Sequence, residues 1–67
     1  MINEVIRFGA SDNDMVLVFD EKGEQMPRFQ GRYEDVRVKI LARAPKGAKF
    51  YHGIWPQGRR LVPRKEW

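Results

Sequence analysis

The stretch RYEDVRVKILARA, residues 32–44, decides the fold class of this 67-residue chain. As an α-helix it gathers its apolar side chains on one face, because positions three and four apart are neighbours on a helix. That face carries Tyr33, Val36, Ile40, Leu41 and Ala44. Glu34 and Asp35 would lie in the first turn and Arg43 in the last, where their charges complement the helix dipole.

The same residues also alternate as the residues of a strand do. Extended, the segment would place Val36, Val38, Ile40 and Ala42 on one face, with basic residues opposite them. The end charges and the alanines favour a helix, and Pro45 with Gly47 would stop it. We therefore predict a helix over about residues 32–44 and keep the strand as the alternative.

A predicted hairpin precedes this segment. Met15–Phe19 (MVLVF) is an apolar run with both faces apolar, which predicts a strand buried on two sides. Residues 20–23 form a turn that ends in Gly23, where a positive φ is needed. Glu24–Gln30 would return as a strand, and Pro27 restricts that strand to a sheet edge or a bulge. Residues 1–7 would be a short strand or a terminal arm.

A second predicted hairpin follows the segment. Its strands are about Lys49–Trp55 and Arg59–Arg64, and Pro56-Gln57-Gly58 supplies the turn. Proline fixes φ at the first turn position, and glycine supplies a positive φ that other residues resist. Pro63 marks the last strand as an edge or ends it early.

The predicted fold is α+β. A small antiparallel sheet of two hairpins, about residues 15–30 and 49–64, is covered by one helix, about residues 32–44. If residues 32–44 were a strand, the chain would be an all-β barrel of the small SH3-like or OB-like kind. The predicted core is Val16, Val18, Phe19, Phe29, Tyr33, Val36, Ile40, Leu41, Phe50, Ile54 and Val62.

Length and composition indicate a single small domain over residues 1–67. A chain this short buries only about 60% of its unfolded surface, so its stability is marginal. The sequence has no cysteine, so no disulfide supports the core, and a homo-oligomer is one way to add stability. No stretch approaches the ~20 apolar residues of a membrane span, and no signal peptide is visible. We expect a cytoplasmic protein that does not bind membranes.

The net charge of +4 is unevenly distributed. Residues 1–42 carry six Lys/Arg and eight Asp/Glu, whereas residues 43–67 carry seven Lys/Arg and a single acid. This asymmetry favours an acidic partner, either nucleic acid or the acidic face of a protein. Basic residues on strand edges also serve to deter aggregation, and that interpretation stays open.

The sequence contains few residues that could serve in catalysis or bind a metal. His52 is the single histidine, Ser11 is the single serine, and cysteine is absent. Their spacing suggests no nucleophile–base arrangement, and one histidine without cysteine is too few ligands for a zinc site. Glu34 and Asp35 are adjacent, so on a helix or a strand their carboxylates diverge. The glycines match no phosphate-binding pattern. We therefore expect no enzyme activity, no catalytic residue, no metal and no cofactor.

The second hairpin is the predicted binding site. If Phe50 and Ile54 face the core, Tyr51 and Trp55 point outward beside a cluster of basic residues. The candidate residues are Lys49, Tyr51, Trp55, Arg59, Arg60, Arg64 and Lys65. Bases stack on aromatic rings and cations follow phosphates, so nucleic acid is the first expected ligand. Trp, Tyr and Arg also dominate protein hot spots, so a regulator or inhibitor that binds an acidic protein face is the alternative. Trp67 is expected to dock on the domain itself.

Overall fold

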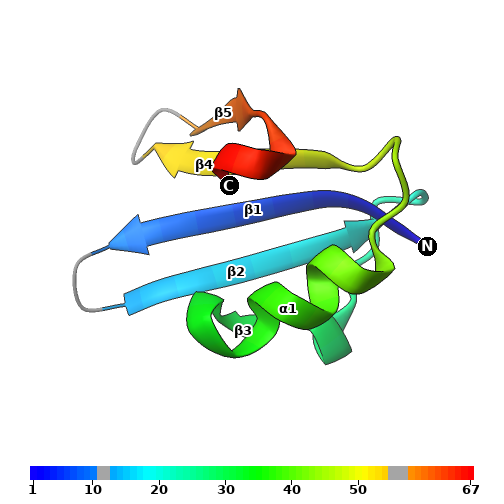
Figure 1. Cartoon of the computed structure of the whole chain (residues 1–67), viewed down its shortest axis with the longest axis horizontal. Helices are drawn as coiled ribbons and strands as arrows, with labels where there is room; N and C mark the ends of the chain where they lie inside the picture. Colours follow the sequence, from blue (N-terminus) through cyan, green and yellow to red (C-terminus); the bar gives the residue numbers. More distant parts are fainter. Residues whose placement is uncertain (11–12, 55–57) are drawn as a thin grey trace.

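The computed structural model describes residues 1–10, 13–54 and 58–67. The described residues form five strands, one α-helix and two short 3-10 helices (Figure 1). In chain order these are β1 (Ile2–Ala10), β2 (Asn13–Asp20), η1 (Pro27–Phe29), β3 (Gly31–Arg32), α1 (Tyr33–Arg43), β4 (Lys49–Ile54), β5 (Gly58–Val62) and η2 (Arg64–Glu66). The predicted α+β class is confirmed, and the alternative barrel is not the observed fold.

The segment that decides the fold class is helical. α1 runs from Tyr33 to Arg43, one residue inside the predicted bounds at each end. Val36 and Ile40 are buried, whereas Val38 is 73% exposed, as helical spacing requires. The acids of the first turn and the arginine of the last turn complement the helix dipole. The local sequence signals therefore agree with the tertiary packing of this element.

The sheet is mixed, which corrects the predicted antiparallel sheet. Its strand order is β3-β2-β1-β4-β5. β1 pairs antiparallel with β2 and parallel with β4, so the N-terminal strand lies at the centre (Figure 1). A parallel pair needs a long connection, and the segment through β2 and α1 provides it. The first hairpin is β1–β2 rather than residues 15–30, whereas β4–β5 is the predicted second hairpin.

The predicted return strand Glu24–Gln30 is not a strand. Only Gln25 makes a bridge, to Phe19, and Pro27–Phe29 is a 3-10 helix. Proline lacks the N–H that a strand ladder needs, and it suits the start of a helical turn. The preceding turn is as predicted, because the Gly23 N–H donates to the Asp20 carbonyl and Gly23 has a φ of 82°.

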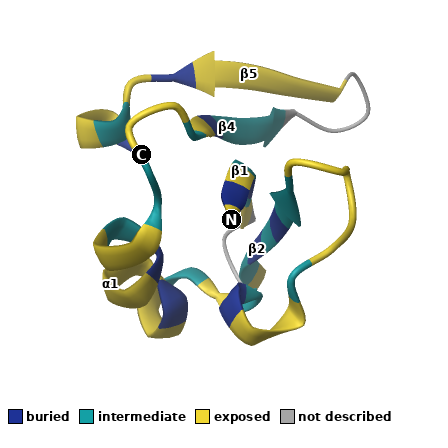
Figure 2. Ribbon diagram, turned by 90° about the vertical axis from the view of Figure 1, so that its right-hand side faces the viewer, coloured by how far each residue is buried: buried dark blue, intermediate teal, exposed yellow. Residues whose placement is uncertain are grey.

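The hydrophobic core lies between the sheet and α1. In Figure 2, α1 and the C-terminal end of the chain lie on the same side of the sheet. The buried cluster on this side consists of Ile2, Val5, Val16, Val18, Phe29, Val36, Ile40, Phe50, Val62 and Trp67. Tyr33 and Leu41 pack against it partly buried. The predicted core lacks Ile2, Val5 and Trp67, and it wrongly includes Phe19, which is half-buried on the other side of the sheet. The predicted Ile54 side chain lies outside the described residues.

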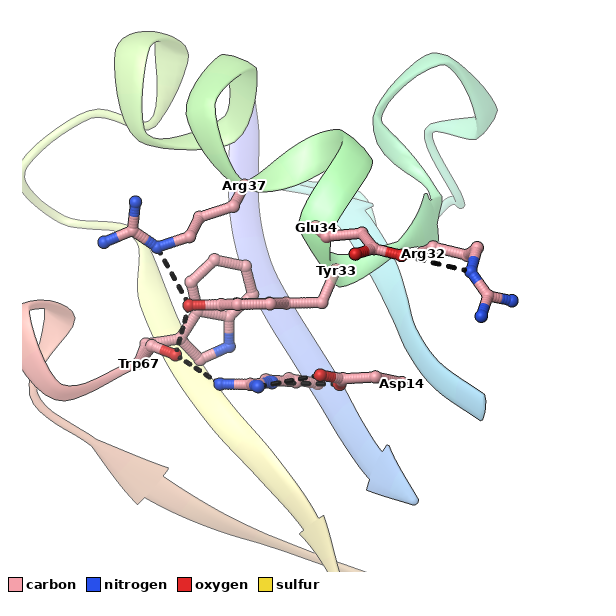
Figure 3. Close-up of polar contacts among 7 residues, drawn as sticks. Asp14, Arg32, Tyr33, Glu34, Arg37 and Trp67 are labelled. Carbon is pink, nitrogen blue, oxygen red and sulfur yellow. Dashed lines mark hydrogen bonds and ion pairs between the residues drawn. The ribbon is translucent and has the colours of Figure 1, made fainter. Parts of the chain in front are cut away.

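The C-terminal segment closes this core. Trp67 is 4% exposed, and its ring makes edge-to-face contacts with Tyr33 and Phe50, at centroid distances of 5.1 and 5.0 Å. The Trp67 main-chain oxygen accepts hydrogen bonds from the Tyr33 hydroxyl and from Arg7, each at 3.0 Å (Figure 3). The expectation that Trp67 docks on the domain is confirmed. No helix in the described part of the chain has the length and apolar character needed to cross a membrane.

Candidate functional site

The strand register divides the side chains between two faces of the sheet. Val5, Phe50 and Val62 are cross-strand partners on the helix side, and all three are buried. Because side chains alternate along a strand, their neighbours point to the opposite side. We call that side the helix-free face, since no described helix lies over it (Figure 2). It includes Glu4, Ile6, Phe8, Met15, Leu17, Phe19, Lys49, Tyr51, Gly53, Arg59 and Leu61.

The helix-free face is largely apolar. Ile6 at its centre is 7% exposed, which shows that the neighbouring side chains cover it. Met15, Leu17, Phe19 and Tyr51 are half-buried on the strands around it. Phe8 is 39% exposed and Leu61 is 60% exposed, although both are large and apolar. A contiguous apolar area of this kind on a small domain is typical of an interaction site.

Phe8 lies directly over Gly53. A Cβ atom added to Gly53 would come within 2.4 Å of Phe8 Cδ1 and 2.6 Å of Phe8 Cε1. Only glycine leaves space for the ring at this position, so the Phe8 side chain from β1 packs on the backbone of β4 at Gly53. The space at Gly53 is therefore filled by Phe8, a residue outside the predicted site.

A basic pair borders the apolar residues on β4 and β5. Arg59 Cζ lies 4.4 Å from the centroid of the Tyr51 ring, a cation–π distance. Arg59 Nη2 also lies 3.4 Å from Glu4 Oε2 across the sheet. The Arg59 guanidinium thus covers one side of the Tyr51 ring and forms an ion pair with Glu4. Lys49 is exposed beside Tyr51 on the same face.

The structure brings together only some of the predicted site residues. Lys49, Tyr51 and Arg59 share the helix-free face. Arg60 is the cross-strand partner of His52 and points to the helix side, and Lys65 is an exposed residue of η2. The predicted contribution of Trp55 lies outside the described residues.

Arg64 is bound within the fold. Its Nη1 donates to the Ala44 carbonyl at 3.2 Å, and its Nη2 donates to the Pro45 carbonyl. Its Cζ lies 5.0 Å from the centroid of the Phe50 ring. Arg64 therefore satisfies carbonyls after the end of α1 and joins this loop to η2, so its side chain has a structural role in the fold.

A second polar cluster lies on the helix side, around Arg7. Arg7 donates to both carboxylate oxygens of Asp14, at 2.9 and 2.7 Å. These hydrogen bonds, together with the charge of Arg7, hold the pKa of Asp14 below its usual value of 3.8. Arg7, His52 and two glycines line a shallow depression of about 340 Å³. The described residues contain no group of three or more His, Cys, Asp or Glu that could hold a metal ion.

No family model, curated protein or solved structure matches the chain. The candidate site therefore stands on its geometry and chemistry. Sequence reasoning missed Phe8 and Leu61, the two exposed large apolar residues of the helix-free face. The run Met15–Phe19 was the signal in the sequence for a second apolar face, because a strand that is apolar on both sides must be buried on both sides. The structure covers one of them with α1.

Proposed function

We propose that this chain is a non-enzymatic protein-interaction module that binds its partner over the helix-free face of the sheet. One observation carries the proposal: an apolar area extends over four strands with no described helix across it, and Phe8 and Leu61 are exposed within it. A partner that covered these side chains would remove apolar surface from water, which is the main favourable term in protein association. Lys49 and Arg59 would lie at the rim, where charge guides orientation and encounter.

The composition of the face favours protein over nucleic acid. Ile6, Met15, Leu17 and Leu61 are aliphatic or thioether side chains, which offer no flat ring for a base. The ring of Tyr51 has a guanidinium 4.4 Å from its centroid, so one of its sides is occupied. The Arg59 guanidinium also lies beside the carboxylate of Glu4, which lowers its attraction for phosphate.

Single-stranded nucleic acid is the second candidate. Tyr51 and Phe8 are rings on neighbouring strands of one face, and Lys49 and Arg59 lie on that face with them. Rings and cations on an open sheet are a known platform for single-stranded RNA. This candidate needs Arg59 to leave Tyr51 or to stack on a base itself.

Photo-crosslinking from the face tests the proposal. A benzoylphenylalanine is placed at Leu61 in one variant of the full chain and at Val38 in another. Val38 is the matched control because it is also an exposed aliphatic residue, at 73% against 60% for Leu61, but lies on α1. Each variant is expressed in cells and irradiated, and adducts are sized with and without nuclease.

We expect a discrete, nuclease-resistant adduct from position 61 and none from position 38. A nuclease-sensitive adduct from position 61 would support the second candidate instead. Equal labelling from both positions, or none from position 61, would overturn the assignment of the helix-free face as the binding surface. Circular dichroism of both variants checks that the fold is retained.

A further inference from the structure

β5 is the outer strand of the sheet and its outward edge is open. The strand order places β5 beyond β4, with no described strand on its other side (Figure 1). Among the described residues, no main-chain hydrogen bond joins residues 58–62 to anything but β4. The first four residues of the strand are exposed, and only Val62 is buried. Unpaired N–H and C=O groups in such a row are a template for another strand.

At the opposite side of the sheet the outer strand β3 is only two residues long, and the neighbouring strand β2 is covered along its outer edge. β3 covers Met15 and Val16 of β2. Beyond it, the Val18 N–H donates to the Gln30 side-chain oxygen at 3.1 Å, and the Val18 carbonyl accepts from the Met26 N–H at 2.8 Å. The chain thus satisfies the edge groups of β2 with its own loop. β5, with five residues, is therefore the longer outer strand that can accept a partner strand.

The side chains of β5 select the chemistry of that partner. Arg60 is exposed, and within the described residues it makes no ion pair or side-chain hydrogen bond. Leu61, the next residue, is 60% exposed on the helix-free face. An added strand would place one residue beside each of them, on opposite faces. The complement to this pair is an acidic residue next to an apolar one.

We propose that the edge of β5 binds an extended acidic peptide segment of a protein partner as an additional strand. Main-chain hydrogen bonds to residues 58–62 hold the segment, an Asp or Glu pairs with Arg60, and the adjacent apolar residue packs on Leu61. Pro63 follows the strand and limits the paired length. This inference rests on the proposed function and specifies which kind of partner the module takes.

Charge disfavours a second copy of this chain as the occupant. Full antiparallel pairing of two copies of β5 would place Arg60 directly opposite the same residue of the second copy. Like charges directly opposite one another destabilise a strand pair. Basic residues at this edge therefore act against self-association and in favour of an acidic segment.

The test is selection of a random peptide library on the immobilised full chain. We expect enriched peptides to contain an acidic residue adjacent to an apolar one, and to lose about tenfold or more in affinity for Arg60→Glu. Lys39→Glu is the matched control, because it makes the same charge change on an exposed position of α1. Binding to the Lys39→Glu variant should be unchanged.

The backbone of the best peptide provides a second readout. In an added strand alternate N–H groups point to β5, so N-methylation should abolish binding at every second position and leave the positions between them tolerant. Affinity that is unchanged by Arg60→Glu, or N-methyl effects without this period of two, would overturn the proposal. Circular dichroism of Arg60→Glu checks its fold.

The outcomes separate this inference from the proposed function. Peptides whose affinity is unchanged by Arg60→Glu but is lowered by Leu17→Ser would show that the helix-free face is the binding surface. They would contradict binding at the edge of β5. Recovery of no peptide would overturn the edge inference, whereas the crosslink from position 61 decides the proposed function independently. A labelled single-stranded oligonucleotide that binds through Arg60, with no acidic peptide enriched, would assign the edge to nucleic acid and overturn the inference.

Discussion

The guanidinium of Arg7 lies over the ring of Tyr33, with its Cζ 3.4 Å from the ring centroid. The same guanidinium donates to both carboxylate oxygens of Asp14 and to the Trp67 main-chain oxygen. The Tyr33 hydroxyl donates to that main-chain oxygen and accepts a hydrogen bond from Arg37 at 2.9 Å (Figure 3). One arginine of β1 thus joins β2, the first turn of α1 and the C-terminal segment.

Arg7→Lys should lower the free energy of unfolding by about 1–2 kcal/mol, because an ammonium cannot make the two parallel bonds to Asp14 and stack on Tyr33 together. Urea denaturation followed by circular dichroism measures the change. Arg37→Lys is the control, since Arg37 bonds the same tyrosine from an exposed position. Its cost should be smaller. Equal costs for the two variants would show that the bonds of Arg7 add nothing beyond surface contacts.

Stability should fall as the pH drops through the range in which Asp14 titrates. The pKa of Asp14 lies below its usual value of 3.8, so between these two values the unfolded chain binds a proton that the folded chain does not. Stability from the pair is therefore complete above about pH 3.8 and is lost as the pH falls toward the lower folded pKa. Urea titrations at about pH 5 and about pH 3 should show a smaller drop for Asp14→Asn than for the wild type. Parallel pH profiles would contradict a role of this pair.

Trp67→Ala should unfold most of the protein. Removing a buried tryptophan costs about 3–5 kcal/mol, which is comparable to the whole stability of a domain this small. Trp67→Phe should cost less, ~1–2 kcal/mol, because it keeps a ring against Tyr33 and Phe50. It also removes a buried indole N–H that has no hydrogen-bond partner among the described residues. Thermal unfolding measures both, and a folded, stable alanine variant would contradict the role of Trp67 in the core.

Gly53→Ala should displace the ring of Phe8 and cost about 1–3 kcal/mol of unfolding free energy. The added methyl would otherwise lie 2.4 Å from Phe8 Cδ1. In a Phe8→Ala background the same substitution should cost less than about 0.5 kcal/mol, because the clash is gone. A double-mutant cycle in urea measures the coupling. Additive costs would show that the two residues do not contact each other.

A single-stranded oligonucleotide should bind weakly at ~50 mM salt and lose its affinity by ~200 mM, as non-specific contacts to phosphate do. Fluorescence anisotropy of a labelled mixed sequence measures this. Lys49→Glu and Lys39→Glu should weaken binding equally, since neither cation then belongs to a defined nucleic-acid site. Salt-resistant binding that only Lys49→Glu and Phe8→Ser abolish would favour the nucleic-acid candidate over the protein-interaction proposal.

Local signals in the sequence were sufficient for α1, for the turn at Gly23 and for the β4–β5 hairpin. The end charges, Pro45 and the spacing of Val36 and Ile40 act within a few residues of one another. Of the predicted site, the placement of Tyr51 on the side opposite Phe50 also follows from alternation alone. Each of these features depends on the backbone preferences of residues that are close together in the chain, so it can be predicted from a short stretch of sequence.

Tertiary structure alone decided where these elements meet. Residues 2–10 became the central strand because Val5 pairs with both Val18 and Phe50, and no local pattern names those partners. The same long-range packing brought Trp67 under Tyr33 and left Phe8 over Gly53 on the helix-free face. Contacts between distant residues depend on which surfaces the chain can bury together. The sequence by itself therefore determined α1, the central part of β2 and the β4–β5 hairpin. Burial of the apolar residues on one side of the sheet determined the site.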